Sequence, residues 1–550
     1  MNLEKIDNSP DKNIVEEISQ KALILIKTLL EISQIPVFYN EEIKTTKLNN
    51  KYKIELRIGY IDLIPSEYYI KIINFSFQYV LWMAENKPTL ENKLSFYKIC
   101  QEEIITPIEK NMPQGKSRIP VLKAAFYKNI PFKHLGNGVY QLGWGSKSRK
   151  MDRSTVDNDS AMGSNLSQNK IFTANLLKMA ELPAPAHSIA NTKEEALKIA
   201  LELQYPIVIK PIDLDRGEGV TININDKNKL FKAFEYAFNL SRGKKVIVEK
   251  QVQGVCHRLF IANNKLLYCV KRLAISIQAD GINSISTLID NANNLEKNKA
   301  PWIKKEFYPK DSLTIEALKK VRYNLESIPL KDTWIELRDI ESTQWGGRDI
   351  DVTNIVHPDN LDIALRASKL FGLNVAGIDI ITTDISKSWN ETNAIINEVN
   401  FAPLLGGAEI SKGYIPRFFD DFMEKDGRIP LEIFVGNTQD TINMAKIKQQ
   451  EYLNTGLKCY LTNHITTLDN NHNEMKFKTN SISNRTQALL LNNSVDALIL
   501  LIQNDEFLHI PIPFDKASKI TIISNEIKSL NSNKNIDEIK FNDLINNLSR

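Results

Sequence analysis

The 550-residue chain has few of the residues that mark several well-known protein classes. Its four cysteines (Cys100, Cys256, Cys269 and Cys459) form no CxxC pair, which argues against a disulfide framework or a Cys-rich zinc site. Its seven histidines form no HxxxH pattern and no plausible catalytic triad, so we expect surface or capping roles for them. These shortages disfavour zinc enzymes and triad hydrolases.

Excess charge and long apolar runs are also scarce. Lys and Arg number 70 against 66 Asp and Glu, a net charge of +4, whereas a general nucleic-acid binder is usually more basic. No apolar run reaches the roughly 18 residues that span a bilayer, and the stretch ALILIKTLLEI from Ala22 is broken by Lys27. The first residues lack the basic-then-apolar pattern of a signal peptide. We therefore predict a cytoplasmic protein with neither a nucleic-acid nor a membrane partner.

The remaining composition is that of an ordinary globular protein. Hydrophobic residues make up 42% and charged residues 25%, enough apolar material for several cores. Helical periodicity is expected over 14–32 and 68–103, and strand-like alternation begins at Lys51. Strand-like PIVIK and VIVEK then alternate with helical patterns over 192–202 and 227–238. This rhythm predicts a multidomain protein of mixed α/β and α+β class.

A lysine followed by a glycine loop is the first candidate site. The segment KPIDLDRGEGV begins at Lys210, where a buried strand ends, and its loop carries Gly217 and Gly219. Phosphate groups need a rigidly held cation and backbone N–H groups that approach without an intervening Cβ. The segment thus indicates a phosphate site. The alternative is a surface lysine before an ordinary turn, because short glycine motifs are common.

Three oxygen ligands in two apolar strands form the second candidate site. Asp379 lies in AGIDIIT, and Glu398 and Asn400 lie in AIINEVNFAP. Buried carboxylates are costly unless they are paired or bind a metal, and Mg²⁺ takes one or two carboxylates together with nucleotide phosphates. Glu398 and Asn400 are two residues apart, so they share one strand face. The alternative is a pair of edge carboxylates bonded to loops.

Arginines and aromatic residues beside strands complete the candidates. Arg258, Arg272 and Arg338 lie in or next to strand-like segments, where arginine often clamps carboxylate or phosphate groups. Each of them could equally be half of a structural ion pair. Tyr140 and Trp144 of GVYQLGWG are expected in a core or an interface rather than in a base-stacking platform.

Taken in order, these motifs resemble the ATP-grasp ligases, and most closely the cyanophycin synthetases. The resemblance starts at IPFKHLGNGVYQLGWGSKSRK from Ile130. It continues through PIVIKPIDLDRGEGV and VIVEKQVQGVCHRLF, and it ends with GLNVAGIDIITTDIS and IINEVNFAP. It is strong over 130–420 and weaker over 1–130. It implies an ATP-grasp fold at 146–427, a cyanophycin-synthetase-like N-terminal domain at 1–145 and a truncated Mur-ligase-like α/β domain at 428–550.

The resemblance also implies roles for individual residues. Lys170 and Lys210 are similar to the lysines that hold nucleotide phosphates, and Gly217 and Gly219 to the loop that covers the triphosphate. Glu249 matches the hinge position that meets adenine. The expected magnesium ligands are Asp379, Glu398 and Asn400, and the positions expected near the phosphates and the acyl-phosphate site are Arg258, Arg272 and Arg338.

The tail resembles the opening of the Mur-ligase-like half of cyanophycin synthetase. Where that half has a phosphate loop of the type GTNGKT, this chain reads GNTQDT from Gly436, with Asp440 in place of the lysine. A carboxylate at that position repels phosphate. We therefore expect a catalytically inactive domain kept for packing or oligomerisation.

The function implied by the resemblance is ATP- and Mg²⁺-dependent amide formation between a carboxylate and an amine. The substrates expected are amino acids or a peptide such as β-aspartyl-arginine, and the protein is expected to form homo-dimers or homo-tetramers. The chain departs from the family pattern at Cys256, Glu218, Gln344 and Trp345. These departures leave an alternative open, namely a weak or inactive ATP-grasp protein that binds a peptide or a partner.

Overall fold

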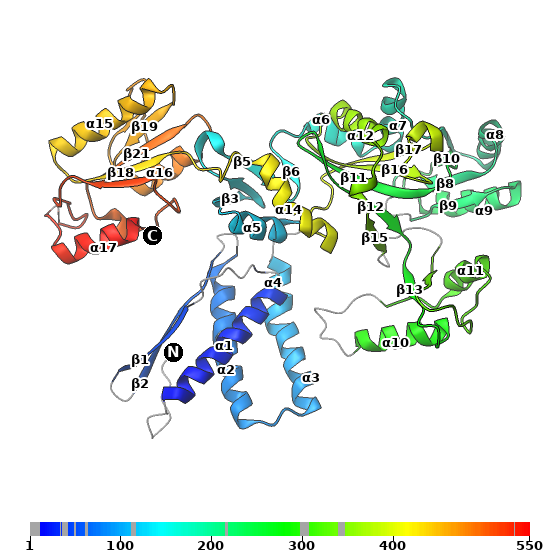
Figure 1. Ribbon diagram of the computed structural model, residues 1–550, viewed down its shortest axis with the longest axis horizontal. Helices are drawn as coiled ribbons and strands as arrows, with labels where there is room; N and C mark the ends of the chain where they lie inside the picture. Colours follow the sequence, from blue (N-terminus) through cyan, green and yellow to red (C-terminus); the bar gives the residue numbers. More distant parts are fainter. Residues whose placement is uncertain are drawn as a thin grey trace. The chain divides into compact units, whose positions relative to one another are not determined.

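The computed structural model describes residues 12–33, 35, 42–48, 51–60, 64–111, 117–214, 218–297, 307–338, 347–532 and 534–549 (Figure 1). The chain divides into two compact units. One comprises 1–60, 64–112 and 158–414, and the other comprises 61–63, 113–157 and 415–550. The division at residues 145 and 427 stays a prediction. No helix among the described residues is long and apolar enough to cross a membrane.

The first unit opens with helices and a hairpin. The predicted helix over 14–32 is confirmed as α1 (Lys12–Ile32), and the strand from Lys51 is β2 (Lys51–Arg57), paired with β1 (Glu42–Leu48). The expected helix over 68–103 is interrupted, because Pro88 separates α2 (Ser66–Glu85) from α3 (Leu90–Ile99). A π-helical turn (Cys100–Ile105) and α4 (Thr106–Asn111) follow.

A four-stranded antiparallel sheet packs one face against two helices, and its other face, here called the polar face, carries Lys210 and Glu249 beside Val208 and Ile247. Its order is β7 (His187–Ala190), β10 (Val246–Lys250), β8 (Ile207–Pro211) and β9 (Thr221–Ile224). Apolar residues of β8 and β10 pack with α8 (Lys193–Leu203) and α9 (Lys227–Leu240). Because side chains alternate along a strand, Lys210 and Glu249 project from the other face.

A five-stranded antiparallel sheet lies at the centre of the same unit. Its order is β15 (Arg348–Asp351), β12 (Lys265–Leu273), β11 (Val255–Ala262), β16 (Val375–Thr382) and β17 (Ile395–Phe401). Ile378 and Ile396 belong to the core that one face forms with α7 (Lys170–Met179) and α12 (Pro358–Leu370). The predicted adjacency of the two apolar strands is confirmed, since β16 pairs with β17.

A small lobe is inserted between β12 and β15. It consists of β13 (Ser276–Gln278), α10 (Ile285–Lys297), α11 (Ser312–Lys320) and β14 (Trp334–Glu336). Its own core is built around Ile285, Ile289 and Leu318. Two short helices of this unit are α6 (Ala161–Ser167) and α13 (Trp389–Thr392), and α14 (Glu409–Phe422) crosses the division after residue 414.

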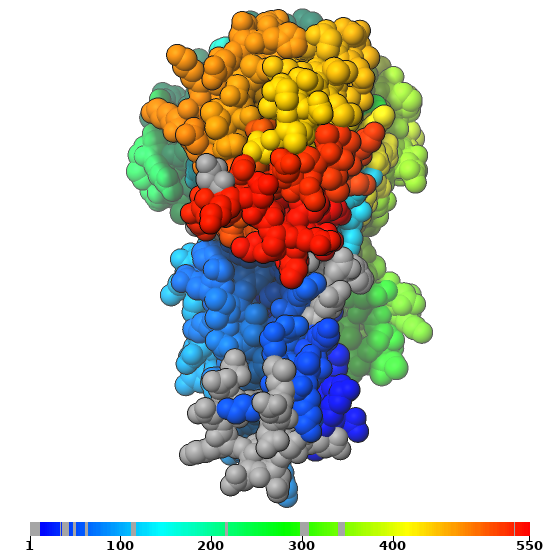
Figure 2. All heavy atoms as spheres, turned by 90° about the vertical axis from the view of Figure 1, so that its left-hand side faces the viewer, coloured from blue at the N-terminus to red at the C-terminus, as the bar shows by residue number. Residues whose placement is uncertain are grey.

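The second unit is a mainly parallel α/β domain joined to a short segment from earlier in the chain. The sheet order is β20 (Thr467–Leu468), β19 (Cys459–Thr462), β21 (Ala497–Ile502), β18 (Leu431–Val435) and β22 (Lys519–Ile522). Its helices are α15 (Gln439–Asn454), α16 (Ile482–Leu490) and α17 (Glu538–Leu548). The last strand and α17 are the red part of the surface in Figure 2.

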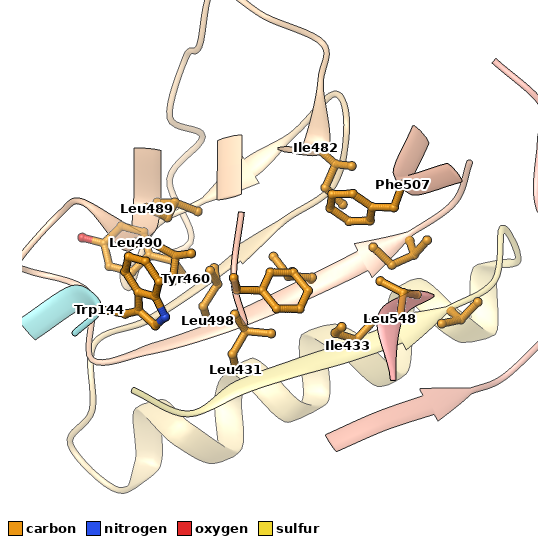
Figure 3. Close-up of a cluster of buried hydrophobic side chains, with 14 of the residues drawn as sticks. Trp144, Leu431, Ile433, Tyr460, Ile482, Leu489, Leu490, Leu498, Phe507 and Leu548 are labelled. Carbon is orange, nitrogen blue, oxygen red and sulfur yellow. The ribbon is translucent and has the colours of Figure 1, made fainter. Parts of the chain in front are cut away.

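The earlier segment of this unit contains α5 (Arg118–Tyr127) and a small sheet. Its strands are β3 (Phe132–Gly136), β4 (Val139–Leu142), β5 (Arg149–Asp152) and β6 (Thr155–Val156). The indole of Trp144 enters the apolar core of the parallel domain, beside Leu431 and Leu498 (Figure 3). Tyr140 is also buried. The prediction that both aromatic residues serve a core is confirmed.

Candidate active site

Charged side chains line the face of the five-stranded sheet that lies opposite its apolar core. Residues directly opposite one another on antiparallel strands share a face, and register aligns Arg258, Asp379 and Glu398 across three neighbouring strands. The Arg258 guanidinium donates from Nε to Oδ1 of Asp379 at 2.7 Å and from Nη2 to Oδ2 at 2.6 Å. Asn400 Nδ2 donates to Asp379 Oδ2 at 3.2 Å. The structure thus brings four predicted site residues together.

A bulge in β17 allows one strand to serve both faces. Pairing shifts between Asp379 and Ile380, so that Ile380 lies opposite Ile396 while Asp379 lies opposite Glu398. The extra residue, Asn397, lets Ile396 reach the apolar core although it stands two residues before Glu398. The carboxylates therefore project toward the charged face without weakening the core behind them.

Glu398 has an environment suited to a bound cation. Among the described residues, its carboxylate has no hydrogen-bond or ion-pair partner. Burial raises the pKa of Glu398, as does the negative charge of Asp379, while the positive charges of Lys170, Lys210 and Arg258 oppose that rise. The carboxylate thus lies close to a second carboxylate and to three cations, two of which come from outside this sheet. The structure therefore gathers both predicted lysines around the same point.

The donor set fits Mg²⁺ together with phosphate oxygens. The described residues contain no cluster of three or more His, Cys, Asp and Glu side chains that would form an all-protein metal cage. Magnesium usually needs only one or two carboxylates, because phosphates and waters complete its coordination. Asp379 accepts three hydrogen bonds, and a carboxylate has about four lone-pair sites. Asp379 and Glu398 are hence the residues that would hold the ion, and Asn400 as a third ligand stays a prediction.

The polar face of the four-stranded sheet supplies the second part of the site. Lys210 Nζ lies 2.6 Å from Glu249 Oε2, and both side chains are largely buried. Lys170, at the start of α7, donates to the backbone carbonyl of Leu214. A Cβ on Gly219 would come within 2.6 Å of Pro211, and its φ of +72° also favours glycine. Gly217 lies outside the described residues.

His187 is a neighbour of this site that sequence patterns did not reveal. It lies opposite Glu249 in the pairing of β7 with β10, and its Nδ1 is 3.1 Å from the Pro185 carbonyl. Burial lowers the pKa of His187, and Glu249 and Lys210 both influence it. No metal-ligand spacing involves this histidine. The only available signal was its position at the start of a strand next to the one that carries Glu249.

The departures from the family pattern lie in different places. Cys256 is opposite Ile381 and shares the charged face with Arg258, two residues away. Glu218 is exposed. Gln344 and Trp345 lie outside the described residues.

The other two predicted arginines occupy contrasting environments. Arg272 is on the charged face, two residues after Val270, which is opposite Arg258. Among the described residues, Arg272 has no hydrogen-bond or ion-pair partner. Arg338 instead lies in the inserted lobe, where Nη1 donates to Thr314 Oγ1 at 2.6 Å and Nη2 to Asp311 Oδ2 at 2.8 Å. Arg272 therefore remains available to a ligand, whereas Arg338 is engaged by α11.

We predict that Arg338→Ala lowers the stability of the inserted lobe by about 2 kcal/mol, because it removes two charge-assisted hydrogen bonds at the N-terminus of α11. Faster amide exchange in α11 is the expected measurement, with the thermal stabilisation by Mg-ATP preserved. Arg272→Ala is the matched comparison and should leave amide exchange in α11 unchanged, because Arg272 lies on β12, outside the inserted lobe. Loss of the ATP response in Arg338→Ala with α11 protection intact would assign Arg338 to the phosphate site instead.

The loop after β18 is closed by its own side chains. Thr438 caps α15 by accepting from the Thr441 backbone N–H at 3.3 Å. Asn437 accepts from Gln503 Nε2 at 3.0 Å, and Gln503 in turn accepts from Asn463 Nδ2 at 2.9 Å. This polar chain connects the ends of three parallel strands. The loss of a phosphate role in the GNTQDT loop stays a prediction.

Several known proteins are similar to this chain. Residues 169–258 match the family model described as carbamoyl-phosphate synthase L chain, ATP binding domain. The cyanophycin synthetase of Synechocystis sp. is 31% identical over 306 residues, which are 55% of this chain and 35% of that protein. The glutathione biosynthesis bifunctional protein GshAB of Streptococcus agalactiae is 30% identical over 246 residues, 43% of this chain and 32% of that protein.

A solved structure, a bifunctional glutathione synthetase from Pasteurella multocida, aligns with a TM-score of 0.43 at 20% identity, covering 64% of this chain and 54% of that one. The chain spans about a third of the length of the two curated relatives named above. The resemblance and the ATP-grasp fold predicted from the sequence are confirmed. The chain is a multidomain α/β protein with an ATP-grasp fold, similar to the cyanophycin synthetases.

Proposed function

We propose that this protein is an ATP-dependent carboxylate–amine ligase that works through an acyl phosphate, on amino acids or on a peptide such as β-aspartyl-arginine. The observation that carries the proposal is the row of Arg258, Asp379 and Glu398 across three neighbouring strands, with Arg258 bonded to Asp379 and the charges of Lys170 and Lys210 acting on Glu398. Two carboxylates and three cations at one point suit a magnesium-bound triphosphate. Similarity to cyanophycin synthetase and to GshAB supports this class of reaction.

The chemistry divides into two steps that require positioning more than acid–base groups. A substrate carboxylate oxygen bonds to the γ-phosphorus of ATP as the bond to ADP breaks. The amine nitrogen then attacks the acyl carbon, inorganic phosphate leaves and the amine loses a proton. Bound Mg²⁺ neutralises charge on the phosphates. Lys170 and Lys210 would hold those phosphates, and Arg258 would keep Asp379 oriented.

A non-catalytic binding module is the alternative left open by Cys256 and Glu218, and it is not favoured. Lys210, Asp379, Glu398 and Asn400 are all present; Asn400 donates to Asp379, and Glu398 lies opposite Asp379 on the neighbouring strand. A module that only bound peptides would have no need for two close carboxylates opposed by cations.

The first experiment incubates purified protein with Mg-ATP, β-aspartyl-arginine and a panel of amino acids and short peptides, and identifies products by mass spectrometry. We expect ADP together with at least one new amide. A ladder of dipeptide units would show polymerisation, and a single new amide would show a ligase of other specificity. Absence of both ADP and product across the panel would contradict the proposal.

We also propose a cellular location, an oligomeric state and a division into domains. By resemblance, it acts in the cytoplasm as a homo-dimer or homo-tetramer, with residues 1–145, 146–427 and 428–550 as its domains and the last as a degenerate Mur-ligase-like domain. Cys100, Cys269 and Cys459 are free thiols, as suits a reducing compartment. Light scattering coupled to size-exclusion chromatography tests the oligomeric state, and a monomer at micromolar concentration would contradict it.

A further inference from the structure

An aromatic floor lies on the charged face, next to the Arg258–Asp379–Glu398 row. Tyr268 is 4% exposed, and its ring stacks on Phe260 at 5.0 Å and on Tyr414 at 5.1 Å between centroids. The Tyr414 hydroxyl donates to Asp351 Oδ2 at 2.7 Å. Asp351 lies opposite Val270 at the edge of the sheet. Aromatic faces and a carboxylate therefore share this end of the face.

Two opposite charges stand beside this floor without neutralising each other. Arg272 and Asp349 are directly opposite on β12 and β15 and so share a face. Neither side chain has a hydrogen-bond or ion-pair partner within the described part of the chain, although a cross-strand Arg–Asp pair normally forms one. Both nevertheless lie close to Tyr268. Burial raises the pKa of that tyrosine, Arg258 and Arg272 oppose the rise and Asp349 adds to it.

This arrangement suits a ligand that carries both charges. An unpaired guanidinium binds a carboxylate in a bidentate fashion. An unpaired carboxylate attracts an ammonium or guanidinium group. Neighbouring strands are about 5 Å apart, so a ligand held between Arg272 and Asp349 begins one strand away from Arg258. That separation is within the length of one amino acid.

We propose that Arg272 and Asp349 form a subsite for the amine-bearing substrate, with Arg272 binding its carboxylate and Asp349 binding a positively charged side group. Asp349 is thus the residue that selects cationic over neutral substrates. The inference rests on the proposed ligase function for its place in the reaction. The binding that it describes is measurable without turnover.

The test compares arginine with citrulline, which has the same shape but a neutral side group, by calorimetry in the presence of Mg²⁺ and a non-hydrolysable ATP analogue. We expect the wild-type protein to bind arginine at least about tenfold more tightly, the size of one charge-assisted contact. Asp349→Asn should reduce the preference to about twofold or less, and Asp349→Glu should restore part of it. Asp362→Asn, at an exposed aspartate on α12, is the matched control.

Agmatine, which lacks the carboxylate, separates the two halves of the subsite. Arg272→Met should weaken arginine and citrulline alike and leave agmatine unchanged. Equal binding of arginine and citrulline by the wild-type protein would overturn the proposal, as would an undiminished preference in Asp349→Asn. Failure of the ATP analogue to bind, with the arginine preference intact, would instead contradict only the ligase function. If the amine panel is turned over, Asp349→Asn should raise KM for cationic amines without changing kcat.

Discussion

Glu398→Gln is expected to abolish Mg-ATP use, lowering kcat/KM by about 1,000-fold or more. Glutamine keeps the shape of the side chain and removes the charge that would hold the metal, and such a metal supplies several kcal/mol of transition-state stabilisation. Thermal stabilisation by Mg-ATP should disappear with the activity, because a ligand raises stability only when it binds the native state.

The same substitution should have a different effect on the stability of the ligand-free protein. Burial and the charge of Asp379 raise the pKa of Glu398, so its ionised form costs free energy in the protein without ligand. Removing that charge should leave the melting temperature of the ligand-free protein unchanged or raise it. Glu391→Gln, at an exposed glutamate of α13 just before β17, is the control and should retain the ATP response. An unchanged ATP response in Glu398→Gln would refute the metal assignment, whereas a large drop in the ligand-free melting temperature would assign Glu398 a structural role.

Trp144→Ala is expected to destabilise the second unit by about 3–5 kcal/mol, the usual cost of emptying a large aromatic site in a core. The indole is 6% exposed and packs among residues of the parallel domain. Its Nε1 donates to Asp515 Oδ1 at 3.2 Å, and its backbone N–H donates to the Gly427 carbonyl at 2.8 Å. A loss of this size is a large share of a typical total stability, and equilibrium unfolding by urea measures it.

Three variants separate the contributions at this position. Trp144→Phe should recover most of the loss, because it keeps the apolar ring, and Asp515→Asn should cost about 1 kcal/mol by weakening one hydrogen bond. Trp82→Ala, at an exposed tryptophan of α2, should cost about 1 kcal/mol or less. Ending the chain after Asp426 should yield insoluble protein, since it would expose Trp144 and remove the Leu490 carbonyl that accepts from the buried Gln141 amide at 2.9 Å. A soluble, ATP-binding product of that truncation would contradict the structural role of residues 428–550.

Local patterns predicted much of the ATP-grasp region because they depend on near neighbours. Apolar runs in PIVIK and VIVEK marked two strands and placed Lys210 at the end of one, and apolar flanks identified Asp379 and Glu398 as buried strand residues, whereas Glu249 was assigned by the resemblance alone. The break at Pro88 was missed, since an apolar period continued on both sides of it. The spacing of apolar side chains along a segment indicates which of its faces is buried. It does not show which strands are neighbours in a sheet.

The sequence by itself determined the class of fold, the identity of the phosphate and metal candidates and the loss of the lysine from the GNTQDT loop. Only the tertiary structure decided which charges meet. The Arg258–Asp379 pair joins residues 121 positions apart, Arg338 is turned to Asp311 in the inserted lobe, and Asp349 is brought opposite Arg272. The physical reason is that strand register and long-range packing set the distances between these side chains. The sequence gives only the chemical type of each residue.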